Sequence, residues 1–432
     1  MGAPRVPVRR TRPGWHSVCG VTSTNWAGNY RYTAARVHRP GTLAELAEIV
    51  AGSDAVHVLG SRHSFNDIAD TTGDLISLTE LPADIVLDTQ TRTVSVGGGV
   101  TYGKLAPQLT AAGWALPNLA SLPHISVAGA VATGTHGSGN RNGSLATAVA
   151  GIEILTGDGE VIELDRQTGG FRGAVVNLGA FGVTTRLVLD LEPAFTVRQF
   201  VFEHLPFAEL LENFDAVTET AYSVSIFTDW VGDAARQVWI KTRSDTVPTV
   251  FSAVAATREM HPLPANPAQS CTPQQGVPGA WSDRLPHFKL EFTPSNGAEI
   301  QSEYLVGRKH AGAAIEVLRS LGDQIAPTLF VSEIRTVAAS DLWLDPAYGR
   351  DSVAFHFTWR PDQAAVERLL PVIEEGLAAF APRPHWGKVF AVPAQHLAQR
   401  YEKLADFRQM AEYFDPRGVF RNGYLRRNVW GA

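Results

Sequence analysis

The sequence predicts a two-domain α+β protein. Its 432 residues are more than one hydrophobic core usually organises. Helix and strand patterns alternate in the first half, whereas alternating apolar and polar strands with two intervening helices dominate from about residue 194. We therefore expect an irregular extension (1–24), a first domain (25–193), a second domain (194–385) and a C-terminal segment (386–432) that returns to the first domain.

The composition argues against several classes of protein. A net charge of −6 gives no electrostatic attraction for nucleic acid. Cys19 and Cys271 are too few for a disulfide framework or a thiolate metal site, so we expect a reducing compartment and no metal ion. No apolar run of about 18 residues occurs, and no apolar core follows Arg9 and Arg10, so neither a membrane span nor twin-arginine export is expected. We expect a cytoplasmic monomer.

Local patterns predict the elements of the first half in order. Thr42 and Glu45 form a capping box that opens a short helix with Leu43, Leu46 and Ile49 on one face. The patterns that follow predict strands at 56–59, 75–78 and 93–96, a helix at 101–112 stopped by Gly113, a hairpin at 152–155 and 161–164, and a strand at 183–191.

The second half shows the period of an antiparallel sheet covered by helices. Apolar residues alternate with polar ones in strands predicted at 223–227, 237–240, 289–292, 330–334 and 353–357. Helices are predicted at 310–321 and 364–378, an irregular stretch at 246–279, and a final helical region at 395–414.

A turn after the strand at 56–59 carries the first candidate for chemistry. His63 follows Gly60 and Ser61 there, so its ring can lie against a flat cofactor with little obstruction. A second segment of small residues, 121–137, supplies another surface of this kind. The alternative is that His63 and His136 are ordinary loop histidines.

Two nucleotide-binding motifs are nearly matched and then fail. Gly98 to Lys104 resembles a phosphate-binding loop, but Leu105 stands where a serine or threonine should bind Mg²⁺. The segment from Gly137 to Gly143 has one residue too many for a dinucleotide-binding fingerprint. An NTPase or an NAD enzyme is therefore poorly supported.

Polar residues inside apolar strands form a second candidate site. Glu333 and Arg335 are two residues apart, as are His356 and Thr358, so each pair points to one face of its strand. Lys388 lies among apolar residues farther along. The alternative is a buried salt bridge, a satisfied histidine and a lysine that only extends its amine to the surface.

Several strings of this sequence resemble the vanillyl-alcohol oxidase superfamily of flavoproteins and, within it, the alditol (xylitol) oxidases. They are Asn-Trp-Ala-Gly-Asn (25–29), Gly-Ser-Arg-His-Ser-Phe-Asn (60–66), Ser-Leu-Pro-His-Ile-Ser-Val-Ala-Gly (121–129), Gly-Thr-His-Gly (134–137), Tyr-Ser-Val-Ser-Ile-Phe-Thr-Asp-Trp (222–230), Leu-Pro-His-Phe-Lys (285–289), Glu-Ile-Arg-Thr-Val-Ala (333–338) and His-Trp-Gly-Lys-Val-Phe (385–390). Arg62 and the N-terminal extension depart from the family pattern.

The resemblance implies bound FAD, attached covalently at His63, in a PCMH-type FAD-binding domain joined to a substrate domain. It implies that FAD is contacted by Val58, Leu59, Gly60, Ser61, Arg62, His63, Ser64, Ser121, Ser126, Gly129, Ala130, Val131, Ala132, Thr133, Gly182, Val183 and His385. It also implies that the hydroxyls of a linear polyol are bound by Ser121, Glu333, Arg335, His356, Thr358 and Lys388.

The implied reaction is oxidation of a terminal alditol hydroxyl, with O₂ reduced to H₂O₂. Burial and a neighbouring cation lower the pKa of a lysine, so Lys388 is the expected base and Arg335 the group that stabilises the developing alkoxide. Two alternatives remain open: an oxidase or dehydrogenase for an aldonolactone or another sugar alcohol, and a carbohydrate-binding protein that has lost catalysis.

Overall fold

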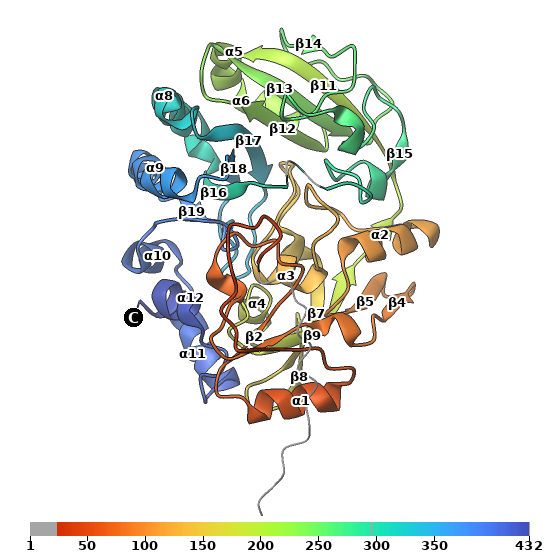
Figure 1. The fold of residues 1–432 in the computed structure, drawn as a ribbon. Helices are drawn as coiled ribbons and strands as arrows, with labels where there is room; N and C mark the ends of the chain where they lie inside the picture. The colour runs from red at the N-terminus through yellow and green to blue at the C-terminus, as the bar shows by residue number, and fades with distance from the viewer. Residues whose placement is uncertain (1–23, 294, 296, 432) are drawn as a thin grey trace, which may run out of the picture.

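The computed structural model describes residues 24–293, 295 and 297–431. The predicted extension at 1–24 lies outside the described residues, apart from residue 24. The nine-stranded sheet lies in the upper half of Figure 1, and the smaller sheets and α1 (Leu43–Gly52) lie in the lower half. The α+β class is confirmed by this mixture of helices and mainly antiparallel sheets.

The lower half contains a five-stranded antiparallel sheet and a three-stranded parallel one. In spatial order the strands are β4 (Ile85–Asp88), β5 (Thr93–Gly97), β9 (Val183–Asp190), β7 (Val149–Leu155) and β8 (Val161–Asp165), and then β1 (Arg36–His38), β3 (Asp74–Ile76) and β2 (Val56–Val58). A two-stranded pair joins β6 (Trp114–Ala115) to β10 (Glu192–Pro193). The predicted hairpin is therefore confirmed as β7 and β8.

The first helix begins as its cap predicts, but one of its apolar residues points outward. Thr42 Oγ1 accepts a hydrogen bond from the Glu45 amide. The Glu45 carboxylate accepts from the amide of Gly41, whereas in a capping box it would accept from the amide of Thr42. Leu46 and Ile49 are buried, whereas Leu43, which was predicted on the same face of the helix, is 44% exposed. The other helices of this half are α2 (Tyr102–Ala111), α3 (Val127–Ala132) and α4 (Phe171–Ala174).

The upper sheet is antiparallel throughout and takes its strands from residues 196–384. In spatial order they are β14 (Val254–Ala255), β11 (Thr196–Pro206), β13 (Ala234–Thr242), β12 (Ser223–Thr228), β17 (Leu329–Val337), β18 (Ser352–Trp359), β16 (Ile300–Gly307) and β19 (Arg383–Pro384), with β15 (Gly279–Ala280) beside β11. The strand predicted at 289–292 is wrong: the Phe292 amide closes a turn onto Lys289. β11 and β16 were not predicted.

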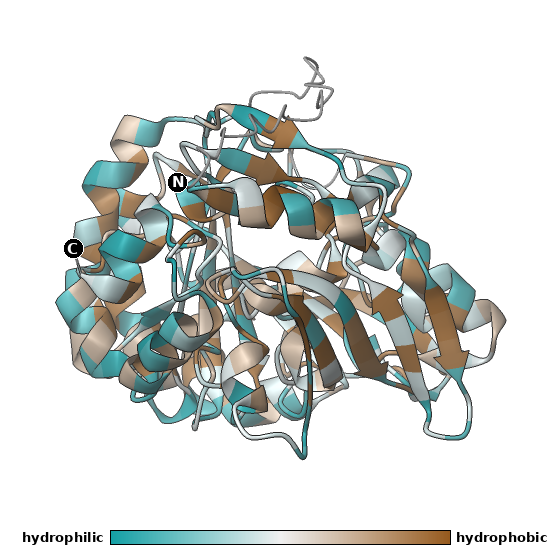
Figure 2. Ribbon diagram, turned by 90° about the horizontal axis from the view of Figure 1, so that it is seen from below, coloured by the Kyte–Doolittle hydropathy of each residue, from teal (hydrophilic) through white to brown (hydrophobic). Residues whose placement is uncertain are grey.

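Helices cover one face of this sheet and leave the other face to a cavity. On β18, Phe355, Phe357 and Trp359 point to the core beneath the helices, and His356 and Thr358 point the other way. The helices are α5 (Phe207–Glu212), α6 (Phe214–Glu219), α7 (Ala311–Ser320), α8 (Gly322–Ile325) and α9 (Gln363–Gly376). Figure 2 shows strands that are largely hydrophobic among helices with one hydrophilic side.

The C-terminal segment packs against the lower half. The helical region predicted at 395–414 is divided into α10 (Ala394–Arg400) and α11 (Leu404–Phe414), and α12 (Gly423–Leu425) follows. Phe407 and Phe414 of α11 contact the ring of Phe181, and Phe420 joins the cluster that contains Leu46. The predicted boundaries at 193/194 and 385/386 remain predictions, although the two large sheets fall on either side of the first.

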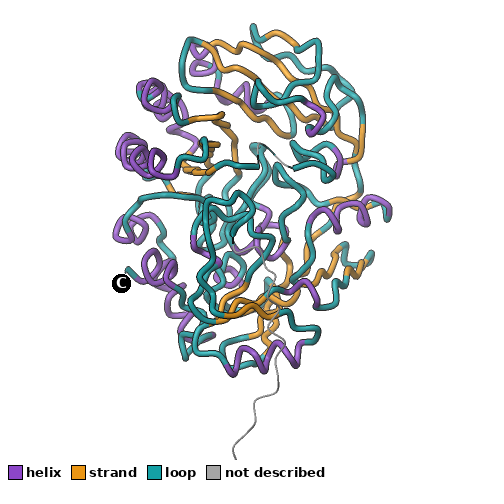
Figure 3. The backbone as a smooth tube through the Cα atoms, viewed as in Figure 1, coloured by secondary structure: helices purple, strands orange, loops and turns teal. Residues whose placement is uncertain are grey.

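Loops converge in the middle of the molecule, between the upper and lower sheets (Figure 3). Among the residues that the structure describes, no helix combines the length and apolar character needed to cross a bilayer.

Candidate active site

A cavity at this junction is lined from both halves of the chain. Every predicted cofactor residue lines it except Val131 and Val183, and all six predicted polyol residues line it. Val131 packs in the main core and Val183 in a smaller core cluster, each at most 1% exposed. The predicted contacts of these two residues with FAD remain predictions.

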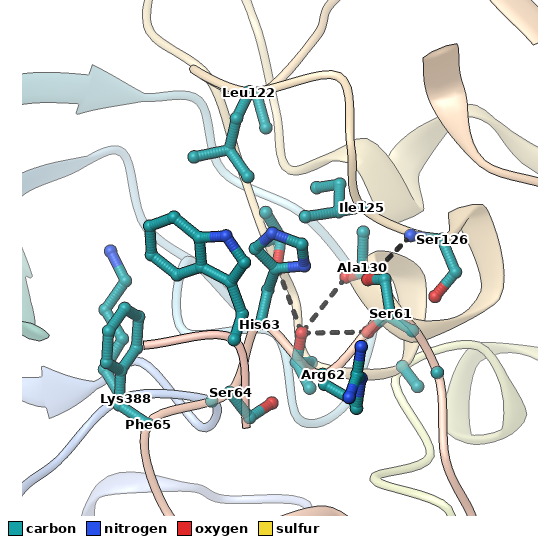
Figure 4. Close-up of a pocket in the computed structure, with 18 of the residues that line it drawn as sticks. Ser61, Arg62, His63, Ser64, Phe65, Leu122, Ile125, Ser126, Ala130 and Lys388 are labelled. Atoms are coloured by element: carbon teal, nitrogen blue, oxygen red, sulfur yellow. Dashed lines mark hydrogen bonds between the residues drawn. The ribbon is translucent and has the colours of Figure 1, made fainter. Parts of the chain in front are cut away.

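His63 stands on the turn after β2 and faces the cavity (Figure 4). Its ring stacks on Trp26, with the centroids 5.1 Å apart. Both ring nitrogens are buried, and neither has a hydrogen-bond partner among the described residues. Burial lowers the pKa of His63 to about 4, so the imidazole is neutral near pH 7 and its nitrogens are available to another group. A buried imidazole whose nitrogens have no partner among the described residues fits a site that holds a cofactor.

The turn is braced by the asparagines of two family strings. Asn25 Nδ2 donates to the Ser64 carbonyl and Asn29 Nδ2 to the Phe65 carbonyl, each at 2.9 Å. Asn66 Nδ2 donates to the Lys388 carbonyl at 2.7 Å, which joins the turn to the segment that carries the predicted base. Arg62, which departs from the family pattern, adopts a left-handed φ of 63°.

Small residues opposite His63 form a surface without room for side chains. A Cβ at Gly60 or at Gly129 would lie 2.8 or 2.7 Å from Ser126 Oγ. The Ser126 amide donates to Ser61 Oγ at 3.1 Å, a bond drawn in Figure 4, whereas no partner for the Ala128 amide is found in the described part of the chain. A flat cofactor with an anionic tail fits this surface, because glycines allow close approach and free amides attract negative charge. Gly98 and Gly99, from the near-match to a phosphate-binding loop, line the same cavity.

On the upper sheet, three neighbouring strands place polar residues in one row. Glu333 of β17 lies opposite His356 of β18, and His356 lies opposite Glu303 of β16. Glu303 is 1% exposed and was not predicted. Gln301 and Glu303 repeat the i, i+2 spacing used for the other two strands, but Ser302 between them hides this alternation in the sequence.

Charged groups meet at Glu303. Its carboxylate contacts Arg335 Nη2, and Lys388 Nζ lies 2.5 Å from its Oε2. Burial disfavours ionisation, but Arg335 and Lys388 outweigh it and hold the pKa of Glu303 well below its usual range. Arg335 also approaches Ser121 Oγ at 3.5 Å and Glu333 Oε2 at 3.7 Å, so both carboxylates are ionised beside this cation.

Lys388, His356 and Thr358 form a chain of hydrogen bonds. Lys388 Nζ lies 2.7 Å from His356 Nδ1, and His356 Nε2 lies 3.1 Å from Thr358 Oγ1. Because the lysine donates, Nδ1 accepts and the proton of a neutral His356 is on Nε2. Thr358 Oγ1 then accepts from His356, which leaves its own O–H free to donate toward the cavity. Burial lowers the pKa of Lys388, Glu303 opposes this shift and Arg335 adds to it.

His287 is a second residue of this site that was not predicted from the sequence. Its Nε2 lies 3.0 Å from Glu333 Oε1, and its amide donates to the Ser121 carbonyl at 2.8 Å. Behind it, Lys241 Nζ donates to the carbonyls of Leu285 and Pro286. His287 is part of the 285–289 string, but the sequence of that string does not indicate that Glu333 is its partner.

Proteins of known activity are similar to this chain over most of its length. An alditol oxidase from Streptomyces sp. is 53% identical over 407 residues, which is 93% of this chain and 98% of that protein. The chain belongs to the alditol oxidase family. Within the vanillyl-alcohol oxidase superfamily, an FAD binding domain family matches residues 34–165, and a D-arabinono-1,4-lactone oxidase family matches residues 296–428.

More distant relatives extend over a similar length. The L-gulono-1,4-lactone dehydrogenase of Mycobacterium tuberculosis is 29% identical over 94% of this chain and 98% of its own. A cholesterol oxidase structure from B. sterolicum superimposes on this chain with a TM-score of 0.77 at 14% identity. The superposition covers 94% of this chain and 96% of the cholesterol oxidase chain. That likeness shows the fold alone.

Proposed function

We propose that this protein oxidises the terminal hydroxyl of alditols such as xylitol and sorbitol to aldoses, with O₂ reduced to H₂O₂. The observation that carries the proposal is the polar row of β16–β18 facing the cavity beside His63, in a chain 53% identical to an alditol oxidase. A polyol has no charge, so its recognition depends on donors and acceptors placed in register with its hydroxyls.

FAD is the cofactor implied by the family, and the residues around His63 fit it. When bound, FAD would supply a two-electron acceptor for oxidation of the carbinol carbon and a source of those electrons for O₂. We infer that His63 holds it covalently, because its neutral ring faces the cavity with both nitrogens unpartnered among the described residues. The small residues of 126–133 would receive the pyrophosphate.

Lys388 is the proposed base. In its neutral form the amine accepts the proton of the reacting hydroxyl, while Arg335 stabilises the negative charge that develops on the oxygen. Both side chains line the cavity and both contact Glu303. Thr358 donates to a further hydroxyl, and the Glu333 carboxylate accepts from another, since His287 occupies only one of its oxygens closely.

A second candidate substrate is an aldonolactone. The D-arabinono-1,4-lactone oxidase family matches residues 296–428, which include the polar pairs of β16, β17 and β18. The higher identity to an alditol oxidase favours the polyol.

The visible spectrum of the purified protein, before and after anaerobic addition of xylitol, tests the proposal. We expect an oxidised-flavin spectrum that xylitol bleaches. A flavin spectrum bleached by L-gulono-1,4-lactone and not by xylitol would transfer the assignment to lactones. Protein without flavin would contradict the proposal.

We further infer a monomer in a reducing, cytoplasmic compartment, an expectation that rests on the two cysteines of the sequence and on the family resemblance. Size-exclusion chromatography with light scattering tests the first part.

A further inference from the structure

Glu303 is the most enclosed charged group of the cavity, and both of its carboxylate oxygens are occupied. Oε1 faces Arg335 Nη2 and lies 3.5 Å from His136 Nε2. Oε2 lies 2.5 Å from Lys388 Nζ and 3.8 Å from His356 Nδ1. Glu303 is therefore held mainly by two cations, and its role is sought in the groups it contacts.

Those groups come from separate parts of the chain. Arg335 is on β17 and Lys388 follows β19, while Glu303 lies on β16. Arg335 lies opposite Ala354 of β18, whose small side chain leaves space for the guanidinium to cross that strand and reach Glu303. A buried carboxylate is strongly disfavoured unless cations lie close to it. One carboxylate thus fixes the positions of two cations that the sheet alone would leave independent.

The hydrogen bonds of the Lys388 amine link the position of Glu303 to the proposed reaction. Its nitrogen is tetrahedral, with one position taken by Cε. Glu303 Oε2 and His356 Nδ1 accept its hydrogens at 2.5 and 2.7 Å. When the amine is neutral, its lone pair therefore occupies the one remaining position, on a residue that lines the cavity.

We propose that Glu303 is a positioning residue, which binds Arg335 and Lys388 through its two carboxylate oxygens and so turns the lone pair of Lys388 toward the substrate hydroxyl. This inference rests on the proposed role of Lys388 as the base. It extends that role, because neither the family strings nor the predicted polyol contacts include Glu303.

The charge of Glu303 also helps to set the pH at which Lys388 loses its proton. Burial and Arg335 lower the pKa of Lys388, and Glu303 raises it. Loss of the carboxylate charge therefore moves deprotonation of Lys388 to lower pH. The charged and titratable groups that face Lys388 are Glu303, Glu333, Arg335, His356, His136 and His385.

The test compares Glu303→Gln, which keeps the shape and removes the charge, with Glu303→Asp, which keeps the charge and shortens the side chain. The readout is the rate of anaerobic bleaching of the holoenzyme by xylitol as a function of pH. This rate rises with pH as Lys388 becomes neutral. We expect Glu303→Gln to move the midpoint of the rise about 1–3 pH units lower and to reduce the plateau rate.

Glu303→Asp provides the matched control. It should keep the midpoint near that of the wild type, but its plateau rate should fall at least about tenfold, because the shorter carboxylate cannot reach both cations. A Glu303→Gln enzyme with an unchanged midpoint overturns the proposal, since a merely structural role would lower only rate or stability. If Glu303→Gln yields no folded flavoprotein, a wild-type plateau in Glu303→Asp overturns it.

A further variant separates this inference from the function beneath it. Wild-type protein that xylitol never bleaches contradicts the proposed function. Lys388→Met that retains the pH-dependent rise contradicts the base assignment, and with it the route by which Glu303 acts. Lys388→Met that loses the rise, together with an unmoved midpoint in Glu303→Gln, contradicts the Glu303 inference alone.

Discussion

Replacement of Lys388 by methionine isolates the proposed base from the rest of the site. Methionine fills nearly the same space, and Glu303 keeps its contact with Arg335, so the cost to stability should stay below the 3–5 kcal/mol or so of an unpaired buried charge. General-base catalysis contributes about 10²- to 10⁴-fold, which corresponds to about 3–5 kcal/mol of transition-state stabilisation. We therefore expect flavin to remain bound and the rate of bleaching by xylitol to fall by that factor.

The assay is stopped-flow bleaching at saturating xylitol, without oxygen, across a range of pH. The pKa of Lys388 is lowered by burial, so the wild-type rate rises as pH passes through that lowered value, and the variant should lack this rise. Lys104→Met, at an exposed lysine of α2, is the matched control and should behave as wild type. A loss smaller than about tenfold in Lys388→Met would refute the reasoning, because it lies below the range of general-base catalysis.

Three further changes test other parts of the site. His63→Ala should release flavin into the supernatant on acid precipitation, whereas in the wild type flavin stays with the protein; the same partition in both would contradict a covalent bond. Thr358→Val removes a buried donor and should lower kcat/KM for xylitol about 5- to 100-fold without altering the flavin spectrum, and unchanged kinetics would show that Thr358 contacts no hydroxyl. Burial lowers the pKa of Lys241 to about 7, so the folded protein carries this amine neutral above that pH while the unfolded chain still binds the proton. The free energy of unfolding of the wild type, relative to that of Lys241→Met, should therefore rise by on the order of 1 kcal/mol per pH unit between about pH 7 and 9. Urea unfolding measures this difference. If the free energies of unfolding of the two proteins changed in parallel with pH, a neutral Lys241 would be contradicted.

The sequence predicted the polar residues of β17 and β18 that line the cavity, because period-2 spacing is a local property of a strand. Glu333 with Arg335 and His356 with Thr358 each point to one face of a strand, whatever lies next to it. Long-range pairing then brought the pairs together, since β17 and β18 are neighbours and place Glu333 opposite His356. The family strings supplied what spacing could not, namely the cofactor.

β16 was missed because its alternation is hidden. Gln301, Ser302 and Glu303 are three polar residues in succession. Ser302 faces the opposite side, where its hydroxyl accepts a hydrogen bond from Trp359 Nε1 at 2.8 Å. A strand buried on both faces can therefore carry polar residues on both, and only tertiary partners reveal which side each one serves. The run 289–292 shows the converse, since its pattern resembles a strand but no neighbouring strand pairs with it within the described chain.

The absence of Val131 and Val183 from the described cavity lining has a simple geometric cause. In α3, Val127 and Val131 are four residues apart and share the face that packs in the core, while the residues between them line the cavity. Val183 lies between Gly182 and Thr184, which both line the cavity, so strand alternation turns it to the other face.

The balance of charge in the cavity explains why an uncharged substrate suits it. Burial lowers the pKa of His136, His287 and His356 to about 4, so these rings are neutral near pH 7. Two carboxylates (Glu303, Glu333) face two cations (Arg335, Lys388) when the proposed base Lys388 is protonated, and one negative charge is left over in this group when Lys388 is neutral. A substrate carboxylate would add a second negative charge beside the buried carboxylates of Glu303 and Glu333, whereas a polyol adds none. In the proposed reaction, transfer of the hydroxyl proton to Lys388 would form a cation beside the new alkoxide. Charge would then separate over one hydrogen bond, and Arg335 and Glu303 would already be in place to stabilise it.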